Sequence, residues 1–418
     1  MKLIIPALAL LAASLAPACR SSVGSWQDDL PRTDAPALSS QSAEPAARWV
    51  EAVPREEAKA WPAGKGILLA LTRWGSTELI ALDPATGAKV SLADKISGEP
   101  ETSQAESRLA VLIPSGVNPA RNTLEIWDLR RGERSVLEPA DGYAFIGFTL
   151  APSGTTVVYT EINLRRSNSR QVLWRTALAD RSQRQIHVLS TSDASSIPAG
   201  VVPVPLAWSE ATREIYFQGL LPFRGMASAG IWSMTADGAV TRLVLLESAY
   251  TAAPRLSSDG RYLAYLATRM EGLPRGYPRS PGAPPPNVLV VMDAARGESI
   301  SSAEQAEAAY GAFAWAGGAA EVLASRREWR EGRLRDVAFL RASIDTSSTL
   351  SRNGIAPASR VTQVGRCGSG PFFWVEEDSE AAKLRAHDAN DANDAKGYEW
   401  MTLPAGKIRV VGCLGERG

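Results

Sequence analysis

Residues with the chemistry for acid–base or nucleophilic catalysis are sparse in this sequence. It contains two histidines, His187 and His387, and no Gly-x-Ser-x-Gly segment that could present a nucleophilic serine beside them. A Gly-rich phosphate-binding loop, a Cys-x-x-Cys pair and a His-Glu-x-x-His segment are also missing. The sequence therefore argues against a serine hydrolase, a P-loop nucleotide-binding protein and a zinc enzyme. We expect a protein that is not an enzyme and needs no cofactor.

An Asp- and Asn-rich run, HDANDANDAKG from His387 to Gly397, has the residue types of a calcium-binding loop. Its spacing departs from that of an EF-hand, because counting from Asp388 places Ala392 at the fifth position and Asn393 where glycine is required. A calcium site and an enlarged solvent-exposed turn are both open interpretations. The turn fits the spacing better, so we assign no metal ligand.

Arginine and aromatic side chains are concentrated in four segments that separate pairs of apolar runs. Together they suit a protein interface or an acidic polymer, because the guanidinium fork matches a carboxylate and aromatic residues are enriched in interfaces. Since the chain has few lysines, arginine as the ordinary surface cation is the alternative. The residues assigned to a candidate partner-binding surface are Arg165, Arg166, Arg224, Arg275, Tyr277, Arg279, Arg327, Trp329 and Arg330.

The elements that would position these segments follow from an internal repeat. A pattern of one large residue, a polar turn and alternating apolar residues occurs as LSSDGRYLAY from Leu256, LAPSGTTVVY from Leu150 and WSEATREIYF from Trp208. Further copies begin near residues 60, 102, 315 and 365, and a second hairpin follows each copy, so the period is about 50 residues. Four short strands per repeat of this length are typical of a β-propeller blade. Seven copies predict an all-β, seven-bladed β-propeller.

The end of the chain predicts how this ring closes. The C-terminal segment KIRVVGCLG resembles the first strand of the preceding blade, RVTQVGRCG, whereas the residues before Trp61 are too polar for a first strand. We therefore expect the C-terminal strand, Ile408 to Gly412, to complete the blade begun at the N-terminus, which hides strand edges. Cys367 and Cys413 would then lie at matching ends of adjacent innermost strands, and we expect a disulfide between them.

Tryptophans on strand positions are expected to pack blade against blade. Trp74 and Trp329 fall at strand junctions and are the two that we expect to be exposed. Stacking on a sugar is the functional alternative for such side chains.

The first residues have the pattern of a secretory signal. Lys2 precedes a short apolar run, and the small residues Ala16-Pro17-Ala18 stand before Cys19, which resembles a bacterial lipobox. The resemblance implies a signal peptide over residues 1–18 and a diacylated Cys19; cleavage that leaves an ordinary thiol is the alternative. Residues 19–58 are rich in Ala, Pro and Ser and predict a flexible linker, which leaves residues 59–418 for the propeller.

LSSDGRYLAY also resembles the repeat of TolB-type propellers, in which a Ser-Pro-Asp-Gly turn precedes an apolar strand; Ser258 replaces the proline here. Only Leu256 to Tyr265 matches well, so the resemblance implies an architecture and an envelope location more than one activity. Basic and acidic residues balance at 45 each, which predicts no nucleic-acid partner.

We therefore expect a monomeric, lipid-anchored scaffold protein of the cell envelope that binds another envelope protein. Residue 20, directly after the cysteine, is Arg rather than Asp, and resemblance to the sorting rule of enteric bacteria implies the outer membrane. An envelope enzyme, or a sensor that binds a small anion or a polysaccharide at the propeller face or channel, is the alternative.

Overall fold

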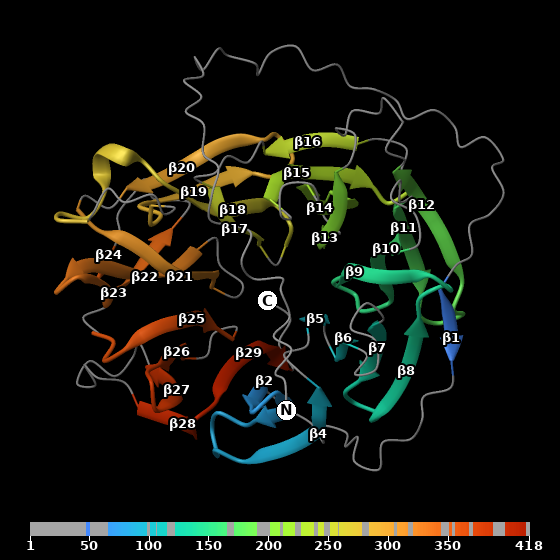
Figure 1. Ribbon diagram of the computed structural model, residues 1–418, viewed down its shortest axis with the longest axis horizontal. Coiled ribbons are helices and arrows are strands. Elements are labelled where there is room, and N and C mark those ends of the chain that lie inside the picture. The colour runs from blue at the N-terminus through green and yellow to red at the C-terminus, as the bar shows by residue number, and fades with distance from the viewer. Residues whose placement is uncertain are drawn as a thin grey trace, which may run out of the picture.

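Seven antiparallel sheets follow one another around a central axis in the described part of the chain (Figure 1). The computed structural model describes residues 47–50, 66–97, 101–105, 107–114, 122–164, 171–189, 201–209, 212–221, 227–237, 241–245, 251–257, 259–277, 284–304, 307–316, 321–343, 351–352, 356–367, 371–387 and 398–414. The predicted all-β class and seven-bladed β-propeller are confirmed. No helix within these residues is long and apolar enough to cross a membrane.

The first four blades contain the following strands. Blade 1 has β29 (Lys407–Leu414), β2 (Gly66–Arg73), β3 (Ser76–Leu82) and β4 (Lys89–Ser97). Blade 2 has β5 (Glu101–Ala105), β6 (Arg108–Pro114), β7 (Asn122–Asp128), β8 (Glu133–Glu138) and β1 (Arg48–Val50). Blade 3 has β9 (Tyr143–Leu150), β10 (Thr156–Asn163), β11 (Gln171–Ala177) and β12 (Gln183–Leu189). Blade 4 has β13 (Val202–Ser209), β14 (Glu214–Leu221), β15 (Ala227–Thr235) and β16 (Thr241–Leu245).

The other three blades have the same order of strands. Blade 5 has β17 (Thr251–Leu256), β18 (Tyr262–Ala267), β19 (Val288–Asp293) and β20 (Glu298–Glu304), with the short 3-10 helix η2 (Met270–Gly272) between its second and third strands. Blade 6 has β21 (Ala309–Trp315), β22 (Glu321–Arg330), β23 (Arg333–Ser343) and β24 (Ser351–Arg352). Blade 7 has β25 (Arg360–Arg366), β26 (Phe372–Glu377), β27 (Ala381–His387) and β28 (Tyr398–Pro404).

The C-terminal strand closes the ring. Strand β29 pairs with β2 in register from Gly66 opposite Leu414 to Thr72 opposite Lys407, so blade 1 takes its innermost strand from the other end of the chain. This confirms the predicted closure. The pairing covers the edge of β2, which would otherwise expose unpaired backbone groups.

The core lies between blades, so both faces of a strand are apolar. In β2, Leu68 packs with Leu109 of blade 2, whereas the adjacent Leu69 packs with Val375 of blade 7. Successive side chains of a strand point to opposite faces, and here each face meets another sheet. This explains why the segment GILLA reads as an uninterrupted apolar run rather than an alternating one.

The predicted flexible linker contains a strand where the structure describes it. Strand β1 pairs with β8, placing Arg48 opposite Glu138, and makes blade 2 five-stranded. Trp49 packs on the core between blades 2 and 3 and lies 5.5 Å from the guanidinium carbon of Arg181. The propeller therefore includes residues before position 59, because an aromatic side chain and a free sheet edge suffice to hold this segment.

Candidate functional site

The two rims of the ring differ in the connections that they carry. Turns between first and second strands form one rim, here called the turn rim. Connections between second and third strands form the other, here called the loop rim. This arrangement follows from the antiparallel order of every blade.

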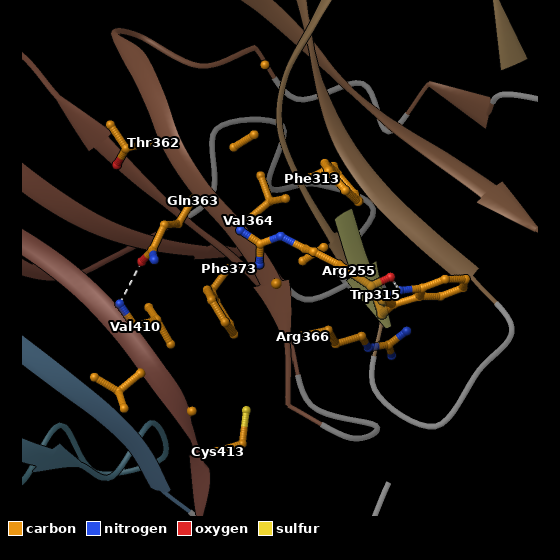
Figure 2. Close-up of a pocket in the computed structure, with 16 residues that line it drawn as sticks. Arg255, Phe313, Trp315, Thr362, Gln363, Val364, Arg366, Phe373, Val410 and Cys413 are labelled. Atoms are coloured by element: carbon orange, nitrogen blue, oxygen red, sulfur yellow. Dashed lines mark hydrogen bonds between the residues drawn. The ribbon is translucent and has the colours of Figure 1, made fainter. Parts of the chain in front are cut away.

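A pocket of about 240 Å³ lies in the central channel, near the turn rim, where blades 5, 6, 7 and 1 meet (Figure 2). It is formed by the final residues of four innermost strands, including Arg255 of β17 and Trp315 of β21. Strands β25 and β29 supply the opposite wall. The lining side chains include Arg255, Phe313, Trp315, Thr362, Gln363, Val364, Arg366, Phe373, Val410, Val411 and Cys413.

Arg255 is the group in this pocket best placed to bind a ligand. Its guanidinium carbon lies 5.5 Å from the centre of the Phe313 ring, and its backbone oxygen accepts a 3.0 Å hydrogen bond from the Trp315 indole. The side chain is open to solvent, and Figure 2 shows it extending toward the middle of the pocket. No carboxylate of the described residues forms an ion pair with it.

The protein around Arg255 weakens its hydration without neutralising it. Desolvation by the surrounding atoms lowers the pKa of the guanidinium from its ordinary value. Arginine nevertheless stays protonated at physiological pH. A cation that is backed by an aromatic ring, partly desolvated and without an acidic partner is suited to bind an anion.

The opposite wall of the pocket joins the two ends of the ring. The Gln363 side-chain oxygen accepts a 2.6 Å hydrogen bond from the Val410 backbone N–H, linking blade 7 to blade 1. Cys367 and Cys413 form a disulfide there, with their Cα atoms 5.6 Å apart. Gly365 is needed for close packing, since a Cβ at this position would collide with the ring of Phe373. These contacts make the wall a fixed surface.

The innermost strands have a strong excess of positive charge, although the whole chain is neutral. Within their described bounds these seven strands carry a single acid, Glu101 of β5, and no histidine. The basic residues on the same strands are Arg255, Arg360, Arg366, Lys407 and Arg409. This excess of basic residues on the described innermost strands favours anions in the channel.

Four of the predicted partner-binding residues, Arg275, Tyr277, Trp329 and Arg330, lie on the loop rim. Tyr277 and Trp329 come from blades 5 and 6 and meet edge to face, with ring centroids 5.0 Å apart. Arg275 is exposed two residues before Tyr277, and Trp329 is half-buried rather than exposed. Assignment of Arg275, Tyr277, Trp329 and Arg330 to a partner surface stays a prediction. Cys19, Arg165, Arg166, Arg224 and Arg279 lie outside the described residues.

The arginine-rich segment of blade 6 is a long hairpin rather than a loop. Strands β22 and β23 are joined by Glu331-Gly332 alone, both with positive φ, as a two-residue hairpin turn requires. Arg327 binds Asp336 through Nε at 3.1 Å and donates from Nη2 to the backbone oxygen of Val361 in blade 7. It therefore holds two blades together.

Acidic neighbours reduce the positive charge on this hairpin. Arg330 binds Glu328 at 2.6 Å, Arg326 binds Glu328 at 3.2 Å, and Arg335 binds Glu331. The positive electrostatic potential at this part of the loop rim is therefore weaker than the number of arginines in the sequence indicates.

Sequence reasoning missed Arg255, although a usable signal was present. The hairpin repeat places PRLSS at the end of an innermost strand, and the innermost strands line the channel of a propeller. Arg255 directly precedes Leu256, the large residue that begins each copy of the repeat, so its place near the turn rim of the channel could be predicted.

The two histidines lie on different blades, His187 on β12 and His387 at the end of β27. The Asp- and Asn-rich run at residues 388–397 lies outside the described residues. Among the described residues, no group of three His, Cys, Asp or Glu side chains could hold a metal ion.

Comparisons with known proteins show similarity of fold only. No protein-family model matches the chain, and no curated protein matches it. The β-propeller domain of the Trilobed protease from Pyrococcus furiosus is 11% identical, with a TM-score of 0.47 over 73% of this chain and 84% of that one. TolB from Acinetobacter baumannii is 12% identical, with a TM-score of 0.41 over 83% and 65%. An oligogalacturonate lyase in complex with manganese is 14% identical, with a TM-score of 0.49 over 74% and 81%.

The expectation that this protein is not an enzyme is corrected by these comparisons. Similar chains include the lyase, an acylaminoacyl peptidase and a prolyl endopeptidase. The prolyl endopeptidase is 14% identical, with a TM-score of 0.47 over 72% of this chain, which spans 42% of that chain's length. Propellers of this kind occur in enzymes, so the fold establishes neither an activity nor its absence.

Proposed function

We propose that this chain is a binding protein of the bacterial cell envelope that takes up the anionic group of a ligand in the central channel. Its lipid anchor at Cys19 and its place in the outer membrane are part of the proposal and rest on the N-terminal sequence. The loop rim around Arg275, Tyr277, Trp329 and Arg330 is the surface proposed to contact a partner protein as a scaffold.

The environment of Arg255 is the main support for the proposal that the channel binds an anion. The guanidinium of Arg255 lies in the pocket next to Phe313 and faces solvent. Among the described residues it has no acidic partner, although a partly desolvated charge usually forms an ion pair. A bound carboxylate would supply that pair in the bidentate geometry that arginine favours. The apolar wall formed by Phe313, Val364 and Phe373 suits a ligand whose carboxylate is attached to an apolar group.

The test uses hippurate, an aromatic carboxylate, and its neutral amide, hippuramide, in ligand-observed saturation-transfer NMR and calorimetry. We expect hippurate to bind and hippuramide not to bind. Replacing Arg255 with methionine keeps an unbranched apolar stem on Phe313 and removes the charge. A hydrogen bond to a charged group contributes about 1.5–3 kcal/mol, so Arg255→Met should weaken hippurate binding by roughly 10- to 100-fold.

Arg255→Lys is the matched control, because lysine keeps the positive charge but cannot bind a carboxylate through two parallel N–H groups. We expect this variant to bind hippurate with intermediate affinity. Equal binding of hippurate to the wild type and to Arg255→Met would refute the proposal, as would equal binding of hippuramide.

A further inference from the structure

Trp74 occupies a position in the fold that tryptophan rarely takes. Strands β2 and β3 are joined by Trp74-Gly75 alone, with Arg73 opposite Ser76 in register. The two turn residues have φ values of 47° and 79°. A hairpin turn of this type favours Asn-Gly, since a positive φ is unfavourable for a bulky side chain. Trp74 is therefore less suited to this turn than asparagine would be.

The Trp74 side chain makes little contact with the rest of the protein. It is 88% exposed, the highest exposure among the large apolar side chains that the structure describes. No aromatic ring or cation of the described residues stacks on it. Burial in the core does not explain this tryptophan, and both faces of its ring are accessible.

A groove of about 390 Å³ lies beside Trp74 on the loop rim, between blades 7 and 1. One side is formed by Thr72, Trp74 and Gly75. The β26–β27 turn, residues 378–381, and the link between β28 and β29, residues 405–407, form the rest of the lining. This groove and the channel pocket lie at opposite rims, so they are separate sites.

Hydrogen bonds hold the floor of the groove in place. Oδ1 of Asp378 accepts from the backbone N–H groups of Glu380 and Ala381, both at 2.8 Å, and these bonds lower the pKa of the Asp378 carboxyl. The Ala405 N–H donates to the backbone oxygen of Glu380 at 2.8 Å. Gly406 packs so closely on β2 that a Cβ would lie 2.9 Å from the Thr72 backbone oxygen. The lining is preorganised.

The groove combines a flat aromatic surface with hydrogen-bonding groups. Asp378, Ser379 and Glu380 are exposed, and carboxylate oxygens accept hydrogen bonds from hydroxyl groups. A pyranose ring has one face of C–H groups and a rim of hydroxyls, so it could lie on the indole and donate to these carboxylates at once.

We propose that the groove between Trp74 and the Asp378–Glu380 turn binds a neutral pyranose glycan. The charged side chains of the lining are the carboxylates of Asp378 and Glu380 and the ammonium of Lys407, so the excess charge is negative and favours uncharged over anionic ligands. They also oppose insertion of Trp74 into an anionic lipid surface, the other common environment of an exposed indole. The proposal is independent of anion binding at Arg255, because no residue lines both the groove and the channel pocket.

The decisive variant is Trp74→Asn, which removes the indole and introduces the residue that the turn prefers. We expect the variant to be at least as stable to heat as the wild type and to bind oligosaccharide about tenfold more weakly or not at all. The measurement is saturation-transfer NMR and calorimetry with cellohexaose, maltohexaose and the N-acetylglucosamine hexamer as probes. Trp74→Phe should retain part of the affinity, and Glu380→Gln should weaken binding while leaving the indole in place.

Arg255→Met is the control for independence and should bind the oligosaccharides as the wild type does. Failure of all three oligosaccharides to bind the wild type would overturn the proposal, and so would undiminished binding to Trp74→Asn. Binding of the wild type to phosphatidylcholine–phosphatidylglycerol vesicles that is lost in Trp74→Asn, without oligosaccharide binding, would assign Trp74 to a membrane surface and overturn it as well.

Discussion

Glu161 should make the folded protein less stable as pH rises through the neutral range. Its side chain is fully buried on β10, where blades 2 and 3 meet the N-terminal strand. Burial raises the pKa of this carboxyl from 4.5 to about 7, and the hydrogen bond from the Ala140 backbone N–H offsets only part of that effect. The folded state thus holds a proton that the unfolded chain releases near pH 4.5.

The sign and size of the effect follow from these two pKa values. Below about pH 4.5 the carboxyl is protonated in both states and contributes no pH dependence. Between that pH and about 7 the folded state binds more protons, so the free energy of unfolding falls with pH; above 7 the loss is complete. The total loss is on the order of 3 kcal/mol.

Glu161→Gln tests this reasoning, because glutamine keeps an oxygen that can accept the 3.0 Å bond from the Ala140 N–H and cannot ionise. In urea unfolding at pH 5, 6, 7 and 8, the free energy of unfolding of the variant relative to that of the wild type should rise by about 2–3 kcal/mol from the lowest to the highest pH. Glu138→Gln is the control, since Glu138 pairs with Arg48 at the surface and its removal should change stability by less than about 1 kcal/mol at every pH. A wild-type-to-variant difference that stays constant from pH 5 to 8 would refute the assignment.

Two further predictions concern the cysteines. The disulfide between Cys367 and Cys413 closes a segment with a sequence separation of 46 residues, so Cys367→Ser with Cys413→Ser should lower the free energy of unfolding by about 2–4 kcal/mol. Intact-mass measurement of protein isolated from the envelope should show both thiols oxidised; two free thiols there would contradict the prediction. Cys19→Ser should move the protein from the membrane fraction to the soluble fraction, and an unchanged distribution on cell fractionation would exclude a lipid anchor at this residue.

The architecture could be predicted from the sequence because it depends on a repeated pattern. Apolar strands and polar turns recur about every 50 residues, and this period survives changes in most individual residues. The closing strand could be predicted for the same reason, since the segment ending in Cys413 repeats the pattern of the segment ending in Cys367. Blade number and closure follow from counting such copies.

Features that depend on pairing between distant residues could not be predicted in this way. The three residues of β1 have no strand pattern of their own, and the partner of Arg48 is 90 positions away. The sequence predicts Arg327 as a surface cation, but the structure makes it a half-buried link between blades, because a register shift in the β22–β23 hairpin places it opposite Asp336. Whether an arginine is available to a partner depends on this register, which local sequence does not reveal.

One strand joins the two candidate sites, which lie at opposite rims of the ring. Strand β29 begins at Lys407 in the acidic groove of the loop rim and ends beside Cys413 in the basic pocket of the channel. Pairing with β2 places Trp74 at the first end, and the disulfide with the segment after β25 fixes the second. The closure of the ring therefore both completes the fold and positions one wall of each site. The proposed anion and glycan sites should respond independently to mutation, because Arg255 lies on β17 and Trp74 lies in the β2–β3 turn, both outside β29.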